Sequence, residues 1–416
     1  MYQVVVIGGG WAGCAAALQA AKSGARTALL ERTDMLLGTG LVGGIMRNNG
    51  RYTAAEEMIA MGGGELFALC DANTRHFNVD FPGHHHANLY DIGKIPGAVE
   101  RKLLEMGVDI FFRCRIEKVT MDGRRLIKLR SDKGEEFEGI VFVDATGSAG
   151  PMRNCTSHGN GCAMCIYRCP SFGGRVSIAA LAGVPEKTAK RSDGKSGAMS
   201  GSCKLYKESL SSEIQQELNE KGVVVIPIPK DLGWGADLSL KACQQYALKD
   251  FHDNIILLDT GHAKLMSPYF PLHHLRKIPG FENARYEDPY AGGMGNSIRF
   301  LALCPRDNTL KVEGVDNLYC AGEKAGLLVG HTEAICTGVL AGYNSSRYVK
   351  GQEGISLPVT TAVGDAIAFV KEQMETEEGL TKKFTFSGSV YFERMKEKGF
   401  YTTDKEKIRE RVKAAG

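Results

Sequence analysis

The sequence lacks any apolar run long enough to cross a bilayer, which takes roughly twenty consecutive hydrophobic residues. We therefore expect no membrane anchor. It also lacks a strong charge bias, because the net charge is only +3 over 416 residues. Binding to RNA would need a local basic face. A hydrophobic content of 43% and a charged content of 24% are typical of a soluble globular protein.

We also expect no leader peptide, since the first apolar strand is expected from residue 2. This arrangement favours a cytoplasmic protein. In that compartment the twelve cysteines are expected to be thiols, metal ligands or redox groups rather than structural disulfides.

The opening residues carry the most specific signal. Tyr2–Ile7 is a short β-branched run, and an alanine-rich stretch that predicts a helix follows it. The glycines between them make a tight turn, let phosphates approach the backbone and let the helix pack closely on the strand. The turn residues predicted to bind a dinucleotide are Gly8, Gly10, Trp11, Ala12 and Gly13.

A second strand and an acid complete this pattern. Thr27–Leu30 is apolar, and Glu31 follows about twenty residues after the glycines, where a carboxylate accepts hydrogen bonds from a ribose diol. Arg32 is predicted at the same site. The order strand, turn, helix, strand, acid favours a dinucleotide-binding unit over incidental glycines.

Further along the chain, the pattern predicts a β-meander followed by an insertion. Extended runs over residues 109–119, 124–130 and 135–143 are separated by Asp-Gly and Lys-Gly turns. The last run leads into residues 143–147 (VDATG). Residues 151–300 differ in composition and are expected to form an inserted α+β domain that holds the substrate.

The remaining segments flank this insertion. Residues 1–150 and 301–350 are expected to form one discontinuous cofactor-binding domain, because residues 315–323 repeat the N-terminal pattern of an apolar strand followed by a glycine and an acid. Residues 351–416 are expected to be a polar helical tail, and residues 186–207 a mobile basic loop.

Three segments resemble the signatures of glutathione-reductase-type FAD domains, namely residues 8–24 with Glu31, residues 143–147 and residues 318–323. Within that superfamily the chain resembles the folate-dependent tRNA-modifying flavoproteins of the GidA and TrmFO type. This likeness is carried by residues 275–284 (LRKIPGFENA), 322–342 (GEKAGLLVGHTEAICTGVLAG) and 357–364 (LPVTTAVG).

The resemblance implies a Rossmann domain that binds FAD. It also implies a helix after Gly330 whose N-terminus faces the flavin ring, where the helix dipole stabilises negative charge. The residues assigned to the cofactor are Gly8, Gly10, Trp11, Ala12, Gly13, Glu31, Arg32, Gly43, Gly44, Ala145, Thr146, Gly147, Gly322, Glu323, Gly330, His331 and Thr332.

Two departures from the family bear on the activity. GidA-type proteins carry a cysteine shortly before the glycine pair that aligns with Gly43 and Gly44, whereas this chain has Gly38-Thr39-Gly40 there. Their long helical tail for tRNA is missing too. We predict an FAD-dependent oxidoreductase that passes electrons to a small molecule or an electron-transfer partner. The alternatives are a methylenetetrahydrofolate- and FAD-dependent uridine methyltransferase acting on RNA, and a non-catalytic flavoprotein that binds a partner.

Four cysteines fall directly after residues 143–147. Cys155, Cys162, Cys165 and Cys169 are spaced C-x6-C-x2-C-x3-C, and a proline follows the last one, as in bacterial ferredoxins. A 4Fe–4S cluster or a zinc ion is the favoured interpretation. A redox-active thiol, with Cys169 as the catalytic candidate, and buried cysteines used as small apolar residues are the alternatives.

Histidines and one glutamate supply the acid–base candidates. His331 and Glu333 are predicted to do this work, because the family likeness puts them nearest the flavin. His273 and His274, together with Tyr269, are weaker candidates, for which packed or surface positions are favoured.

Two further features carry weak signals. Adjacent side chains of His84-His85-His86 cannot all reach one ion from a regular element, so a polar loop is expected there. Residues 291–295 are glycine-rich but lack a flanking strand and helix, so NAD(P)H is expected only as a transient reductant docked over the flavin. A homo-oligomer is compatible with the sequence.

Overall fold

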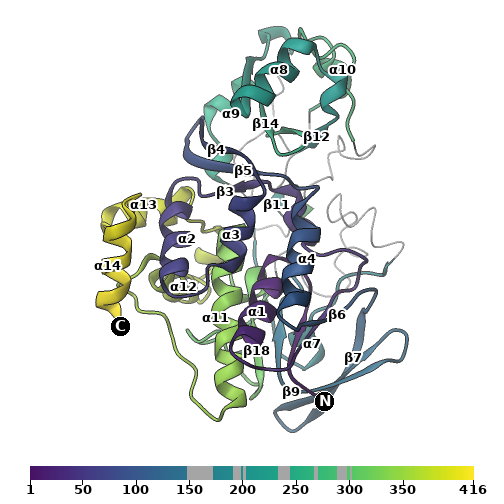
Figure 1. Ribbon diagram of the computed structural model, residues 1–416, viewed down its shortest axis with the longest axis vertical. Helices are drawn as coiled ribbons and strands as arrows, with labels where there is room; N and C mark the ends of the chain where they lie inside the picture. Colours follow the sequence, from purple (N-terminus) through teal and green to yellow (C-terminus); the bar gives the residue numbers. More distant parts are fainter. Residues whose placement is uncertain are drawn as a thin grey trace.

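A mixed α/β core dominates the computed structural model of this chain (Figure 1). The structure describes residues 1–147, 172–190, 198–199, 203–232, 244–266, 270–287, 298–299 and 302–416. Its seven-stranded sheet has the order β6-β2-β1-β9-β8-β7, and β18 also pairs with β9. The strands of this sheet are β1 (Tyr2–Ile7), β2 (Thr27–Leu30), β6 (Asp109–Phe111), β7 (Ile116–Asp122), β8 (Arg125–Ser131), β9 (Glu136–Asp144) and β18 (Leu318–Cys320).

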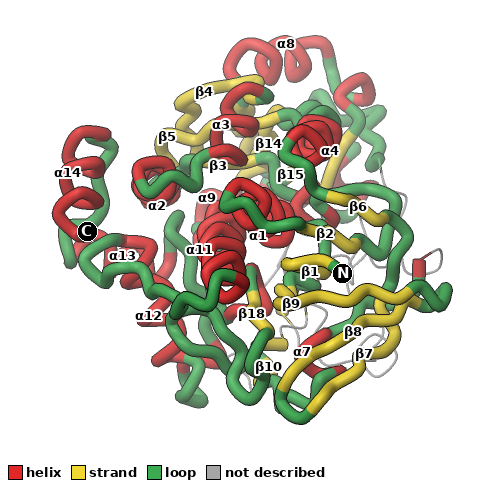
Figure 2. Tube along the Cα trace, turned by 60° about the horizontal axis from the view of Figure 1, so that its bottom comes forward, coloured by secondary structure: helices red, strands yellow, loops and turns green. Residues whose placement is uncertain are grey.

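The parallel half of the sheet confirms the predicted dinucleotide unit. β1 runs parallel to β2 and β9, and β18 runs parallel to β9. Helices α1 (Trp11–Lys22) and α11 (His331–Val349) pack on each other beside these strands (Figure 2). Gly338 and Gly342 allow this approach, because a Cβ at either position would overlap the backbone of α1.

The antiparallel half confirms the predicted meander but corrects its first strand. β7, β8 and β9 pair in sequence order. The run expected over residues 109–119 is two strands, since β6 pairs with β2 at one edge of the sheet and β7 lies at the other. One continuous strand cannot occupy both edges, and the chain turns between them at Arg113, where φ is +54°.

An antiparallel sheet of order β12-β15-β14-β13 forms the upper part of the molecule in Figure 1. The interior of β14 (Asn254–Asp259), residues 255–258, is apolar, and both of its faces are buried. Alternate residues of a strand point to opposite faces. Ile255 and Leu257 therefore join the core of the upper part, whereas Ile256 and Leu258 join a second cluster with β4 (Thr74–Phe81) and β5 (His84–Tyr90).

The hydrophobic core of the upper sheet is formed by residues from Cys203 onward. Within the predicted insertion 151–300, residues 176–189 pack on the main core instead. The remaining elements of the upper part are β12 (Cys203–Leu205), β13 (Val223–Pro227), β15 (Ala263–Leu265), α8 (Ser212–Lys221), α9 (Lys249–Asp253) and α10 (Leu272–Leu275).

The predicted tail is helical, as expected, but it is part of the main core. Phe384 and Tyr391 are fully buried there. Buried Glu57 accepts hydrogen bonds from the backbone N–H groups of Ala362 (2.9 Å) and Val363 (3.0 Å), which stabilises the N-terminus of the first tail helix. The helices concerned are α2 (Gly50–Ala60), α12 (Ala362–Gln373), α13 (Ser389–Glu397) and α14 (Lys405–Ala415).

The basic loop predicted over residues 186–207 is built into the fold where the structure describes it. Lys187 and Lys190 form ion pairs with Glu375 and Glu377 of the tail, both at 2.6 Å. Cys203 is fully buried in β12. The smaller elements are β3 (Ile45–Met46), β10 (Lys187–Thr188), β11 (Ala198–Met199), β16 (Ile298–Arg299), β17 (Ala302–Leu303), α3 (Glu65–Ala72), α4 (Ile95–Glu105), α7 (Ile178–Leu181), and the 3-10 turns at Gly38–Val42 and Gly322–Ala325.

Among the described residues, no helix is both long enough and apolar enough to cross a bilayer.

Candidate functional site

The glycine turn after β1 is closely packed at two of its glycines and open at a third. Gly8 has a φ of +103°, and a Cβ there would overlap the Ala145 carbonyl group. A Cβ at Gly13 would overlap the Gly8 carbonyl oxygen, so a glycine is required for α1 to sit this close to the strand. At Gly10, by contrast, a Cβ would meet nothing within 4 Å. The open space lies at the N-terminus of α1, where backbone N–H groups favour a phosphate.

Glu31 directly follows β2 and lines a smaller pocket together with Gly8. Its carboxylate accepts hydrogen bonds from Gly9 N (2.8 Å) and from Thr33 Oγ1 (2.7 Å). The carboxylate therefore fixes the glycine turn. This pocket is lined by the predicted residues Gly8, Glu31, Arg32 and Thr146, with Ile7, Leu30, Cys114, Ile116, Arg175 and Val176.

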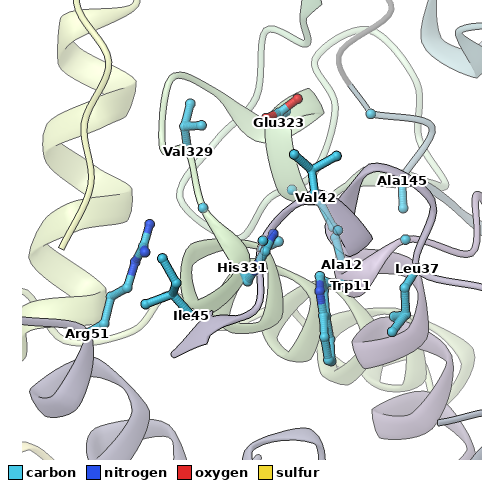
Figure 3. Close-up of a pocket in the computed structure, with 18 of the residues that line it drawn as sticks. Trp11, Ala12, Leu37, Val42, Ile45, Arg51, Ala145, Glu323, Val329 and His331 are labelled. Carbon is cyan, nitrogen blue, oxygen red and sulfur yellow. The ribbon is translucent and has the colours of Figure 1, made fainter. Parts of the chain in front are cut away.

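A larger cavity lies among Trp11, Ala145 and His331 (Figure 3), and residues of the upper part of the molecule also line it. It lies at the carboxyl ends of the parallel strands, the usual ligand position in such sheets. We call its lower side, formed by Gly10, Trp11, Ala12, Ala145, Gly147, Gly322, Glu323, Gly330 and His331, the glycine floor. We call its upper side, formed by Gln245, Tyr246, Lys264 and Met266, the insert wall.

His331, the first residue of α11, faces this cavity as predicted. Its Nδ1 lies 3.1 Å from the hydroxyl of Tyr90, a fully buried residue of β5. Burial raises the pKa of Tyr90 far above its usual range, so the hydroxyl beside Nδ1 keeps its proton. Gly43 packs against the Cε1 edge of the ring, since a Cβ there would overlap Cε1 of His331.

Glu333, the other predicted acid–base residue, does not line the cavity. Its fully buried carboxylate pairs with Arg51 Nε (3.0 Å) and accepts from Thr385 Oγ1 (2.7 Å) and Phe386 N (2.9 Å). All of these contacts are structural, and this geometry gives no support to an acid–base role. Arg51 does line the cavity, so Glu333 orients a cation at its edge.

Lys264 of β15 brings the insert wall onto the floor. Its ammonium group is buried and donates to the carbonyl oxygens of Val42 and Gly43, the second at 2.6 Å. Burying an ammonium group is costly unless acceptors surround it. These bonds therefore tie the upper sheet to the loop that packs on His331.

The polar loop predicted at the histidine run is wrong for His84. It is fully buried in β5, stacked between Phe81 and Tyr246 with both centroid distances at 4.8 Å. Nε2 donates to the Gln245 carbonyl oxygen (3.0 Å), and Nδ1 accepts from Asn48 Nδ2 (3.0 Å). Burial lowers the pKa of His84 to about 3, so the ring stays neutral and holds the insert wall.

Other predicted residues lie away from the cavity lining. Gly44 turns the chain with a φ of +91°, and Thr332 is buried with its hydroxyl toward Met46. His273 and His274 sit on α10, outside the cavity. Tyr269 and the cysteines at 155, 162, 165 and 169 lie outside the described residues.

Several cavity residues were not anticipated. Arg51, Tyr246 and Lys264 come from three distant segments and belong to no local motif. The one signal available for Lys264 was its position as a single charge between apolar neighbours of a short strand.

Comparisons with known proteins agree with this geometry. Residues 3–153 match the family described as "FAD dependent oxidoreductase", and residues 258–353 match "Glucose inhibited division protein A". The Aquifex aeolicus GidA structure in its form II crystal superposes with a TM-score of 0.70, at 17% identity, over 99% of this chain and 76% of that one. These two segments are therefore similar to FAD-dependent oxidoreductases and to GidA proteins, and the chain shares the GidA fold.

Curated relatives of the GidA/TrmFO type include the methylenetetrahydrofolate–tRNA-(uracil-5-)-methyltransferase TrmFO of Bacillus mycoides (strain KBAB4) and that of Bacillus cereus (strain AH187). Each is 35% identical over 99 residues, which is 23% of this chain and 21% of the relative. The match therefore spans about a fifth of these relatives' length.

The residues present fit the family's cofactor. The open space over Gly10, the N-terminus of α1 and the pocket beside Glu31 suit the ADP half of FAD, and the cavity beside His331 suits the flavin half.

Proposed function

We propose that this protein is an oxidoreductase whose second substrate, a small molecule, binds between the glycine floor and the insert wall. One observation carries the proposal: a single cavity is lined both by the dinucleotide turn and by residues of the upper sheet. FAD, when bound, supplies the redox chemistry, and the protein supplies position and electrostatics.

The residues of this chain divide the work by position. The N-termini of α1 and α11 offer backbone N–H groups and partial positive charge to the phosphates and to the flavin ring. Arg51 and Lys264 place positive charge at the cavity, which favours substrates that carry or develop negative charge. Tyr246 and Met266 add apolar side chains to the cavity lining.

Anaerobic purification followed by a visible spectrum and donor tests examines the proposal. We expect flavin bands that bleach when NADH, NADPH or reduced ferredoxin is added, and that return with an electron acceptor. A protein that holds flavin but is bleached by none of these donors would favour the non-catalytic alternative. A colourless protein that takes up no added FAD would reject the function.

We also propose that residues 148–171 carry a 4Fe–4S cluster on the four cysteines. Support comes from the described residues at both ends of that segment. Gly147 lines the large cavity, and Arg175 lines the pocket beside Glu31. A cluster near the flavin would exchange single electrons with it. Iron and acid-labile sulfide analysis should find about four of each per chain; flavin alone would reject the cluster.

Uridine methylation in RNA with methylenetetrahydrofolate is the second candidate. The TrmFO relatives support it by name. Against it, none of the described residues that line the cavity is a cysteine. Incubation with RNA and folate labelled on the methylene carbon separates the two functions, because label in uridine requires the methyltransferase and its absence leaves the oxidoreductase.

A further inference from the structure

Arg175 places a guanidinium group where the two parts of the FAD site meet. Its side chain lines the smaller pocket beside Glu31. Its Nη1 also lies 4.0 Å from the position that a Cβ would take at Gly147, a residue that lines the larger cavity. Gly8 lines the smaller pocket and Gly10 the larger cavity, so a ligand that fills both crosses the glycine turn. Arg175 lies beside that crossing.

The backbone on both sides of Arg175 is held in place, which directs its side chain to the pocket. Arg32 Nη1 donates to the carbonyl oxygen of Gly173. Arg115 Nε donates to the carbonyl oxygen of Gly174 at 2.7 Å. The residue after Arg175 is buried in the main core. Two arginines therefore position the short stretch of chain that carries the third.

The phosphate end of the site has little other positive charge. The N-terminus of α1 offers about half a unit charge, and the single basic residue of that helix, Lys22, lies in its last turn. The cations of the larger cavity are engaged with the protein, because Arg51 pairs with Glu333 (3.0 Å) and Lys264 donates to two carbonyl groups. A guanidinium group can bind two phosphate oxygens at once, so Arg175 has the chemistry that a diphosphate requires.

We propose that the guanidinium group of Arg175 binds the diphosphate of FAD. The inference rests on the FAD site described above, and it adds a side-chain cation to the backbone N–H groups of the glycine turn. It makes Arg175 a determinant of affinity for the cofactor, with Arg32 and Arg115 as the residues that position it.

Replacement of Arg175 by glutamine tests the proposal, since the variant keeps a polar side chain and loses the charge. We expect the dissociation constant of FAD from the apoprotein to rise about tenfold or more, as the loss of a charge-assisted hydrogen bond predicts. Arg125→Gln is the matched control, because it removes the same charge from an exposed residue of β8 that lines neither pocket. It should bind FAD within twofold of the wild type.

Salt dependence separates an ionic role of Arg175 from a structural one. Raising the salt concentration from about 0.05 M to about 0.5 M should weaken FAD binding by the wild type more than by Arg175→Gln, because ions screen the attraction between guanidinium and phosphate. Arg175→Lys keeps the charge and should recover this salt sensitivity. If Arg175→Gln binds FAD within twofold of the wild type, or keeps its full salt sensitivity, the inference is overturned while FAD binding itself stands.

A measurement on the unaltered protein does not depend on how the variants fold. Phenylglyoxal modifies accessible arginine side chains, and mass spectrometry locates the adducts. Because Arg175 is only partly buried, we expect it to react in the apoprotein and to be protected by FAD, whereas Arg125 should react equally with and without FAD. Equal modification of Arg175 in both states overturns the inference. Failure of the wild type to bind FAD would instead reject the cofactor assignment, and this inference with it.

Discussion

The glycine floor and the insert wall bound one cavity but are specified in different ways. The floor comes from local patterns, in which Gly8, Gly10 and Gly13 stand at fixed offsets between a strand and a helix. The wall comes from Tyr246 and Lys264, which reach the cavity only because β14 and β15 pair and pack on β5. In this molecule short sequence motifs specify the floor, and tertiary contacts specify the wall.

The largest effect is expected where the floor meets the rest of the core. Glu333→Gln leaves the Arg51 guanidinium buried without its carboxylate, which should lower the free energy of unfolding by about 3–5 kcal/mol. Urea denaturation of the apoprotein measures it. Glu410→Gln, on the exposed face of α14, is the control and should change little. A Glu333→Gln variant that is stable but inactive would instead restore the acid–base role.

Substitution of Lys264 should most directly weaken the contact between the insert wall and the glycine floor. Lys264→Met removes the bonds to the Val42 and Gly43 carbonyl groups, each charge-assisted, and should cost about 1.5–3 kcal/mol of stability. FAD should also dissociate faster, because the loop against His331 is released. Stopped-flow flavin fluorescence measures the rate. Exposed Lys277→Met is the control, and equal dissociation rates for the two variants would show that the wall does not hold the floor.

Within the floor, two glycines should respond differently to the same added methyl group. Gly13→Ala places a Cβ on the Gly8 carbonyl oxygen and should destabilise the apoprotein by about 1–3 kcal/mol. Gly10→Ala meets no protein atom, so it should keep the stability of the apoprotein but weaken FAD binding. Paired urea and FAD titrations compare them. Equal losses of stability in both variants would contradict the proposed geometry of the turn.

The most pH-dependent effect is expected at His84. Because its pKa falls from 6.5 to about 3 on folding, the unfolded chain binds a proton that the folded chain does not. Stability should therefore decrease as the pH falls from about 6.5 toward about 3, by up to about 1.4 kcal/mol per pH unit. In His84→Gln this part of the slope should vanish, whereas exposed His85→Gln should keep it. Retention of the slope in His84→Gln would assign it to other groups.

The sequence could predict those parts of the fold that depend on neighbours along the chain. β1, α1, β2 and the meander have clear periodicity and turn residues, and the glycine signal identified the floor. Periodicity could not show that β6 and β7 lie at opposite edges of the sheet. Nor could it show that His84 is buried, because its burial comes from Phe81, Tyr246 and Asn48, which lie up to 162 residues away.

The candidate site divides along the same line. His331 reaches the cavity, as the family likeness implied, because it follows a glycine at a helix start. Glu333, two residues on, points to the opposite side of the same turn and meets Arg51. Spacing alone places both residues in the first turn of α11. Only the packing of α2 and the tail determines which one faces the ligand.

The double burial of β14 has a consequence for how such proteins can diverge. The upper sheet cannot be replaced as an independent domain, because β14 contributes side chains to two hydrophobic clusters. Its removal would take Ile256 and Leu258 out of the cluster shared with β4 and β5. The insert wall must therefore diverge by single substitutions and not by replacement of the whole upper sheet. Protease digestion should accordingly release no folded fragment of either half, and heating should melt both halves in one transition.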